Sequence, residues 1–404
     1  MGLEDERWVR GSAVAAVVIA VGIAIAEVAL LDKNWLISID FRVYHMGGSS
    51  VLHGISPYDV TTKDGNPFAY TPFAALVFVP LALLSLPVAL AVWTFLSMLA
   101  LEVSIWLALG LPGSESSVRR ARLTTLTTVA ALPMAPVMLN IGVGQINALL
   151  MLLVLIDLVR RPGRTQGIAL GIAAGIKLIP LLFIAYLLIT RRTRAAMVAA
   201  ATFAATVLLG FAVLPGPSVR WWAHLMLDTE RMSPPGAAYF NQSMRGVLAH
   251  FPGALHSAWV WLPLAVLVGI AGLAISAWAD RRGMAAAGAM ACAATSLLIS
   301  PIAWTFHWVW AAPALALWLR WARRRQDPAH TAGVVVMWSI LVASGVLTFL
   351  IVARVPGLAS ADVLMHGTMT TVVTLNGLTM LAALGFLGAL AAMLWRTDRS
   401  ESFV

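Results

Sequence analysis

A short polar stretch at residues 39–45 carries the groups best suited to acid–base chemistry. It holds Asp40, Arg42, Tyr44 and His45, and it follows the first long apolar run. A carboxylate beside a cation and two hydrogen-bonding groups is a plausible general base. A carboxylate can also lie in the lipid headgroup region without a role, but ionisable groups at membranes are enriched at functional sites. We therefore take Asp40 as the candidate base.

A lysine and a polar turn add possible binding groups. Lys177 interrupts an apolar run, and Pro180 breaks the helix nearby. The lysine must therefore either snorkel to the interface or pair with an anion such as a lipid phosphate. Asn140, Gln145 and Asn147 bracket a glycine-rich turn. Amides at such a turn serve equally well as helix caps or as ligands for a substrate, and both roles remain open.

The segment at residues 241–245 is also suited to a sugar or a phosphate. Amide, hydroxyl and cationic groups follow one another in it, as Asn241, Gln242, Ser243 and Arg245. Arg245 can equally anchor the outer membrane interface.

Residues 300–310 combine tryptophans with a histidine. An aromatic belt at the membrane interface explains Trp304, Trp308 and Trp310. It does not explain His307, whose pKa normally lies near working pH. We expect His307 to hydrogen-bond a leaving phosphate or to shuttle a proton.

Composition and missing motifs exclude several function classes. Nucleic-acid binding is not expected despite a net charge of +9, because the arginines cluster between apolar runs. The single cysteine, Cys292, excludes an intrachain disulfide, and no His or Glu spacing suits a metal cage. The sequence contains no nucleotide-binding loop, dinucleotide fingerprint or Gly-x-Ser-x-Gly motif. We therefore expect no metal and no nucleotide cofactor.

The elements that position these residues are membrane helices. The chain is 60% hydrophobic and only 11% charged, and its mean hydropathy is +0.87. Residues 13–31 alone are long enough to cross a hydrocarbon core of about 30 Å. The sequence therefore predicts an all-α polytopic membrane protein that forms a single transmembrane domain over residues 1–404.

Arginine clusters predict the sidedness of the helices. If every cluster is cytoplasmic, both termini are cytoplasmic and about twelve helices result. The expected helices lie at 13–31, 87–109, 123–139, 145–159, 166–176, 178–190, 195–214, 257–279, 284–299, 308–321, 333–352 and 371–395. Two long outer loops follow, at 32–71 and 215–254. The proline-rich piece at 71–86 is expected to be a re-entrant or surface-lying helix, or else a hairpin that violates the charge rule.

Several short motifs together resemble a known enzyme family. They are Tyr-Thr-Pro-Phe at 70–73, Gly-Gln-Ile-Asn at 144–147, Gly-Ile-Lys-Leu-Ile-Pro at 175–180, Asn-Gln-Ser-Met-Arg-Gly at 241–246 and Ser-Pro-Ile-Ala-Trp-Thr-Phe-His-Trp at 300–308. With an Asp after the first helix, this order resembles the polyprenol-phosphate-mannose-dependent mannosyltransferases of glycosyltransferase family 87, which have the GT-C fold. The match is closest to the mycobacterial α-1,2-mannosyltransferases that extend phosphatidylinositol mannosides. Thr71 departs from the family pattern, in which many members have Pro.

The resemblance implies an enzyme of the plasma membrane whose active site faces the periplasm. The donor would be polyprenyl phosphomannose and the acceptor a phosphatidylinositol mannoside, joined in an inverting α-1,2 transfer without a metal. Asp40, or alternatively Asp59, would be the base, and Lys177, Arg245 and His307 would stabilise the leaving phosphate. The remaining substrate contacts would come from Arg42, Tyr44, His45, Tyr70, Gln145, Asn147, Asn241, Gln242, Ser243 and Trp304.

Two alternatives remain. Within the family, the alternative is a related α-mannosyltransferase that acts on lipomannan or lipoarabinomannan. A lipid or glycolipid transporter is the alternative from another class. It would place polar groups at mid-membrane and often carry an internal repeat, whereas the polar groups here gather on one expected side.

Overall fold

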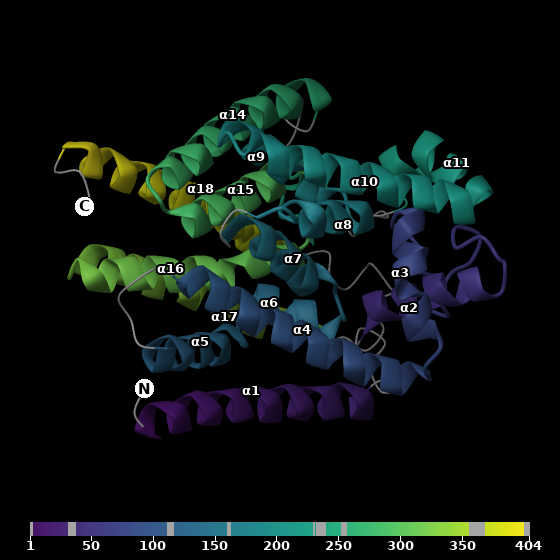
Figure 1. Cartoon of the computed structure of the whole chain (residues 1–404), viewed down its shortest axis with the longest axis horizontal. Helices are drawn as coiled ribbons and strands as arrows, with labels where there is room; N and C mark the ends of the chain where they lie inside the picture. The colour runs from purple at the N-terminus through teal and green to yellow at the C-terminus, as the bar shows by residue number, and fades with distance from the viewer. Residues whose placement is uncertain are drawn as a thin grey trace. The chain divides into compact units, whose positions relative to one another are not determined.

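The computed structural model describes residues 3–30, 38–110, 117–159, 163–228, 231, 240–251, 257–354 and 368–399. Apart from one isolated bridge between Thr61 and Pro67, the regular structure of these residues is helical (Figure 1). The predicted all-α class is therefore confirmed.

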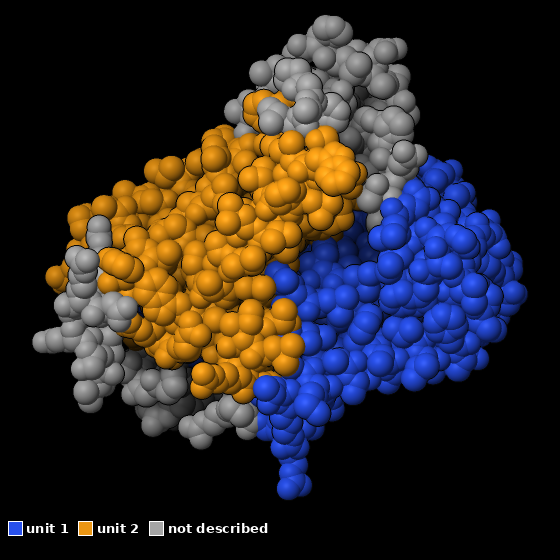
Figure 2. Space-filling view, turned by 90° about the horizontal axis from the view of Figure 1, so that it is seen from above, with its two compact units in different colours: residues 1–132, 137–184, 193–232 blue, residues 133–136, 185–192, 233–404 orange. Residues whose placement is uncertain are grey.

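The chain forms two compact units, which Figure 2 colours separately. Unit 1 comprises residues 1–132, 137–184 and 193–232, and unit 2 comprises residues 133–136, 185–192 and 233–404. The helices of unit 1 are α1 (Leu3–Leu30), α2 (Ile39–Leu52), α3 (Pro72–Ala82), α4 (Leu86–Leu109), α5 (Ser117–Ala131), most of α6 (Ala135–Gly142), α7 (Asn147–Val159), α8 (Ile168–Ile176), η1 (Ile179–Leu181), α10 (Thr193–Val213), α11 (Pro215–Ala223) and η2 (Leu225–Leu227). The helices of unit 2 are most of α9 (Leu182–Ile189), α13 (Met244–Leu248), α14 (Ala258–Arg281), α15 (Ala285–Ile299), η5 (Thr305–Trp310), α16 (Ala311–Arg324), α17 (Pro328–Arg354) and α18 (Thr368–Arg399).

Several of these helices are long and apolar enough to cross a membrane. Within the described residues they are Leu86–Leu109, Thr193–Val213, Ala258–Arg281, Pro328–Val346 and Gly377–Trp395. A bent pair, Val118–Ala131 with Ala135–Gly142, would add a sixth span. The chain is therefore a membrane protein with several candidate spans. The twelve-helix topology and the position of the termini stay predictions.

Prolines account for the main differences from the predicted helices. The expected helix at 123–139 is broken into α5 and α6, which are bent by 80°. Pro133 and Pro136 lie at this break, where their rings and missing N–H groups prevent a continuous helix. The piece at 71–86 forms the short helix α3. Its 11 residues reach only about 16 Å at 1.5 Å per residue, too short to cross alone.

Both expected outer loops contain helices. The 32–71 segment includes α2, which begins immediately before Asp40. The 215–254 segment includes α11, η2 and α13, with residues 229–230, 232–239 and 252–254 outside the described part.

In unit 1, α1 lies alongside α4 and α5, and α4 also packs against α7 (Figure 1). Helix α8 packs closely on α10 because Gly171 and Gly175 face it. A Cβ at Gly171 would lie 2.5 Å from the Thr202 Cβ, and one at Gly175 would lie 2.3 Å from the Thr206 hydroxyl. Small residues at four-residue spacing commonly let membrane helices approach in this way. This contact fixes the end of α8, which Lys177 follows.

A tight turn between α6 and α7 joins three segments of unit 1. Gly144 has a φ of +71°, and a Cβ there would lie 2.5 Å from the Cβ of Phe41. Its carbonyl accepts a hydrogen bond of 2.8 Å from the indole nitrogen of Trp93 on α4. Glycine is therefore required at this position both for its backbone conformation and for space.

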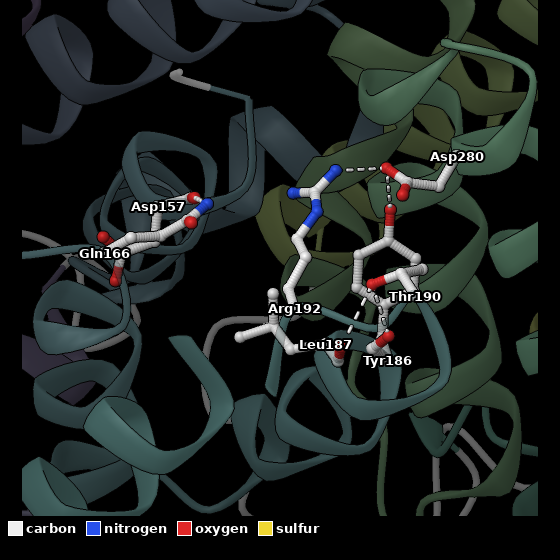
Figure 3. A network of polar contacts seen from close by, with 7 residues as sticks. All are labelled: Asp157, Gln166, Tyr186, Leu187, Thr190, Arg192 and Asp280. Carbon is white, nitrogen blue, oxygen red and sulfur yellow. Dashed lines mark hydrogen bonds and ion pairs between the residues drawn. The ribbon is translucent and has the colours of Figure 1, made fainter. Parts of the chain in front are cut away.

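A charged network lies in unit 2. The Asp280 carboxylate at the end of α14 accepts a hydrogen bond of 3.1 Å from the Tyr186 hydroxyl and forms an ion pair with Arg192 (Figure 3).

In unit 1, an aspartate caps the start of α8. The Asp157 carboxylate accepts a hydrogen bond of 2.8 Å from the backbone nitrogen of Leu170, in the first turn of that helix. A side-chain oxygen at this place satisfies an N–H group that has no partner within the helix.

The glycine turn gives a stability prediction. We expect Gly144→Ala to lower the free energy of unfolding by about 2–4 kcal/mol, because the alanine combines left-handed strain with a clash against Phe41. Gly142→Ala is the matched control, since its Cβ would meet nothing within 4 Å and lies in a helix. Thermal unfolding of both variants in detergent measures the difference. Equal melting temperatures for Gly144→Ala and Gly142→Ala would show that glycine is not required at position 144.

Candidate active site

The first turn of α2 is held by the turn that follows α6. The backbone N–H of Ser38 donates to the Gly142 carbonyl at 2.7 Å, and that of Asp40 donates to the Val143 carbonyl at 3.0 Å. The N–H of Phe41 donates to the same Val143 carbonyl at 3.2 Å. The first N–H groups of a helix have no partners within it, so these carbonyls complete the helix start. Asp40 is thereby fixed next to the residues of the turn.

Three groups from distant segments act on the Asp40 carboxyl. The charge of Lys177 and a side-chain hydrogen bond from Gln145 lower its pKa, and the Asp40 charge in turn acts on Tyr70. Lys177, Gln145 and Tyr70 all lie outside the helices that are long and apolar enough to span a membrane. Burial raises the pKa of the Asp40 carboxyl above its usual range, and the lysine charge and the Gln145 hydrogen bond partly offset this rise. A carboxyl with a raised pKa accepts a proton more readily near neutral pH.

The side chains of Tyr44, Tyr70 and Gln145 bond to one another. The Tyr44 hydroxyl donates to Gln145 Oε1 at 2.8 Å, and Gln145 Nε2 donates to the Tyr70 hydroxyl at 3.2 Å. The two hydroxyls are 3.0 Å apart. Three of the expected site residues, although far apart in the sequence, therefore meet near Asp40.

Lys177 lies between α8 and η1, with its ammonium group inside the site. Its Nζ donates to the Asn147 Oδ1 at 3.1 Å and lies 5.5 Å from the centre of the Tyr70 ring. Burial lowers the pKa of Lys177, and the nearby Asp40 charge opposes this fall. The partly buried ammonium makes Lys177 suitable for an anionic ligand.

Thr71 fastens the Lys177 segment. Its hydroxyl donates to the Gly175 carbonyl and accepts a hydrogen bond of 3.1 Å from the Ala74 nitrogen, so it also caps α3. Proline cannot make either bond. Thr71 therefore has a structural role: it ties α3 to the end of α8.

The two other polar residues near Asp40 in the sequence are His45 and Arg42. His45 Nε2 lies 3.1 Å from the Leu84 carbonyl. The Arg42 side chain is half-buried, and its backbone nitrogen donates to the Ser38 carbonyl at 2.9 Å. Their expected substrate contacts stay predictions.

Asp59, the alternative base, has a different environment. It forms an ion pair with Arg220 of α11, and the Asp59 side chain is 56% exposed. The nearby Arg231 donates to the Tyr58 carbonyl at 3.0 Å. These contacts tie the segment before α3 to the segment that includes α11, which is a sufficient structural role for Asp59.

In unit 2, the side chain of Asn241, an expected substrate-binding residue, forms hydrogen bonds with the protein backbone. Its Nδ2 donates to the Pro301 carbonyl at 2.9 Å, and its Oδ1 accepts from the Ala303 nitrogen at 2.9 Å. The Gln242 backbone nitrogen donates to the Ala303 carbonyl at 2.6 Å, and the Ser243 hydroxyl caps α13. These bonds hold the segment that leads into η5.

His307 and its neighbours are also in unit 2. The Trp304 backbone nitrogen donates to His307 Nδ1 at 2.7 Å, so the neutral ring carries its proton on Nε2 and can donate from there. Trp304 is half-buried and stacks on Phe306. Arg245 lies 5.5 Å above the Trp261 ring.

The sequence did not single out Trp93 or the pairing of Asp280 with Tyr186. Trp93 lies inside an apolar helix, where nothing in the pattern shows that its indole binds the Gly144 carbonyl. Asp280 is followed directly by arginines, so it reads as part of a cytoplasmic charge cluster. Among the described residues, no three His, Cys, Asp or Glu side chains gather as a metal site.

Comparison with known proteins gives the family. The model of glycosyltransferase family 87 matches residues 68–301. A Mycobacterium tuberculosis H37Rv protein named polyprenol-phosphate-mannose-dependent α-(1-2)-phosphatidylinositol mannoside mannosyltransferase is 35% identical over 74% of this chain and 75% of its own. A Mycolicibacterium smegmatis protein of the same name is 33% identical over 73% of this chain and 72% of its own.

A third relative, from Mycobacterium tuberculosis CDC 1551, is named as the corresponding phosphatidylinositol pentamannoside mannosyltransferase. It is 33% identical over 78% of this chain and 74% of its own. No solved structure matches the chain with significance. The family match and these identities, which extend over most of each chain, show that this membrane protein belongs to glycosyltransferase family 87.

Proposed function

We propose that this protein transfers mannose from polyprenyl phosphomannose to a phosphatidylinositol mannoside and forms an α-1,2 linkage. Family membership supports the reaction class, and the names of the relatives support the donor and the acceptor. The observation that carries the proposal is the half-buried Asp40 carboxyl, on which Lys177 and the hydrogen-bonded amide of Gln145 both act.

The proposed chemistry needs one base and no enzyme nucleophile. The acceptor hydroxyl oxygen bonds to the anomeric carbon of mannose while the bond from that carbon to the phosphate oxygen breaks. The hydroxyl proton passes to Asp40, and polyprenyl phosphate leaves. Because the donor mannose is β-linked in this proposal, an α product means inversion by a single displacement.

Lys177 is the proposed partner of the donor phosphate. Its ammonium group already contacts Asn147 within the site, and a cation placed where negative charge develops favours the transition state. We propose an assisting role at the leaving phosphate for His307, through its Nε2 proton, and for Arg245. Asn241 and Ser243 support the segment that carries His307, in addition to the sugar contacts expected from the sequence.

We further propose that the site faces the periplasm and that both termini are cytoplasmic, with about twelve spans. The support is the distribution of arginine clusters between apolar runs. Reporter fusions within residues 216–252 and 320–326 test this arrangement. A cytoplasmic signal from the 216–252 segment would contradict it.

An assay of the purified protein tests the function as a whole. Polyprenyl phosphomannose is supplied with a panel of phosphatidylinositol mannosides and with lipomannan, in the presence and absence of a chelator. Mannose transfer to a phosphatidylinositol mannoside that withstands the chelator is the expected result. Transfer to lipomannan alone would assign the related activity, and no transfer to any acceptor would reject the proposal.

The base is tested by a matched pair of substitutions. Asp40→Asn keeps the size of the side chain but cannot accept a proton at neutral pH, so we expect turnover to fall by a factor of about 10² to 10⁴. Asp59→Asn removes an equal charge from an exposed ion pair and should change turnover only slightly. Steady-state kinetics of both variants measures the contrast. If Asp59→Asn alone abolishes turnover, the base is Asp59.

The phosphate partner is tested by donor binding. We expect Lys177→Ala to weaken the binding of polyprenyl phosphomannose by about 1.5–3 kcal/mol, because a charge-assisted contact is lost. Lys63→Ala removes the same charge from an exposed loop and serves as the control. Titration calorimetry in detergent compares both with the parent protein. An unchanged affinity in Lys177→Ala would remove Lys177 from the phosphate site.

A further inference from the structure

The amide of Gln145 makes all its described hydrogen bonds inside the site. Its Oε1 accepts from the Tyr44 hydroxyl at 2.8 Å and from the Ile146 backbone nitrogen at 3.2 Å. Its Nε2 donates to the Tyr70 hydroxyl at 3.2 Å and also to the Asp40 carboxyl. An amide has two N–H donors and one carbonyl acceptor, so this set uses both kinds of group.

The two tyrosines and the amide form a closed ring of hydrogen bonds. The Tyr44 hydroxyl has one proton, which it gives to Gln145, so the contact of 3.0 Å between the hydroxyls has Tyr70 as its donor. The Tyr70 oxygen in turn accepts from Gln145 Nε2. Every member donates once around the ring, an arrangement in which each bond strengthens the next.

The backbone of Ile146 selects the direction of this ring. A flipped Gln145 amide could bond both tyrosines in the reverse sense, but its NH₂ group would then face the Ile146 N–H. Its carbonyl oxygen would also face the Asp40 carboxylate. Both contacts are repulsive, so one orientation of the amide remains, and in it the second N–H is directed at Asp40.

The rings of the two tyrosines are themselves fixed by packing. Tyr44 is completely buried and stacks on Phe78 with ring centres 4.5 Å apart, and Trp93 lies 5.5 Å away. The Tyr70 ring meets Tyr44 edge-on at 5.1 Å. The hydroxyls that hold the amide are therefore placed before any substrate binds, as a precise site requires.

We propose that Gln145 is a positioning residue for Asp40, and that the pair of Tyr44 and Tyr70 locks its amide so that one N–H always points at the carboxylate. This donation orients the carboxylate and favours the ionised form that accepts a proton. The sequence suggested substrate contacts for all three side chains, and the ring gives them a different task. The inference rests on the proposed role of Asp40 as the base.

The inference has a consequence for pH dependence. The titratable groups that interact electrostatically with Asp40 are Lys177 after α8, Tyr70 before α3 and Tyr44 on the same helix as Asp40. Burial raises the pKa of both tyrosines, so they stay neutral. The hydrogen bond from Gln145 lowers the pKa of Asp40, and its loss therefore raises that pKa. Activity requires ionised Asp40, so the acid limb of kcat/KM then moves to higher pH.

The test is the pH profile of kcat/KM for two variants. Gln145→Met removes the amide, and Tyr44→Phe removes only the hydroxyl that holds it, leaving the stacked ring. We expect both to move the acid limb upward by about one pH unit. The donor phosphodiester has no proton that titrates near neutral pH. The position of the limb is also independent of the fraction of protein that is active, so partial misfolding does not imitate the shift.

Tyr58→Phe is the matched control. Its hydroxyl is buried and donates to the Tyr70 backbone carbonyl at 2.8 Å, outside the ring, so its loss disturbs the same neighbour without releasing the amide. Its acid limb should coincide with that of the parent protein. An equal shift in this control would show a general structural disturbance and overturn the inference.

The remaining outcomes separate this inference from the proposed function. If Asp40→Asn abolishes turnover while Gln145→Met and Tyr44→Phe titrate like the parent, Asp40 is the base and the positioning role is wrong. A higher KM for the donor in Gln145→Met with an unmoved acid limb would assign Gln145 to substrate binding instead. If Asp40→Asn keeps its turnover, the base assignment fails and the inference fails with it.

Discussion

The backbone carbonyls of the turn at residues 142–144 determine where the site of unit 1 can form. They accept hydrogen bonds from the first turn of α2 and from the Trp93 indole of α4. Each partner satisfies a donor that its own helix leaves unpaired, so the turn is energetically linked to both helices. Gln145 follows directly in the chain. Any shift of the turn therefore moves Asp40 and Gln145 together and preserves their relation.

The sequence predicted most helices but not the contacts between them. Long apolar runs with polar ends mark α4, α10 and α14 within a few residues of their observed bounds, because length and hydropathy suffice for that. The same information cannot show that Tyr44 bonds Gln145, about a hundred residues away. Such a contact depends on how helices pack, and a single sequence contains no direct signal of it.

Helix geometry explains why Tyr44 and His45 have different partners. Residues four apart share a helix face, which puts Tyr44 on the side of Asp40. His45 is five positions on, about 140° further round the helix, and binds the Leu84 carbonyl instead. The sequence grouped both with Asp40 by proximity alone. The break in the expected 123–139 helix was readable in principle, since Pro133 and Pro136 lie inside it.

In the proposed reaction, the pairing of Asp40 with Lys177 would keep the net charge of the site constant through the transfer step. Before transfer, the carboxylate and the ammonium compensate each other, and the donor phosphodiester adds one negative charge. Transfer neutralises the carboxylate at the moment when the departing phosphate gains its second negative charge. The lysine, no longer compensated, then faces a dianion. The total charge enclosed by the protein is thus the same before and after the step, so the low-dielectric surroundings need not reorganise around a new net charge.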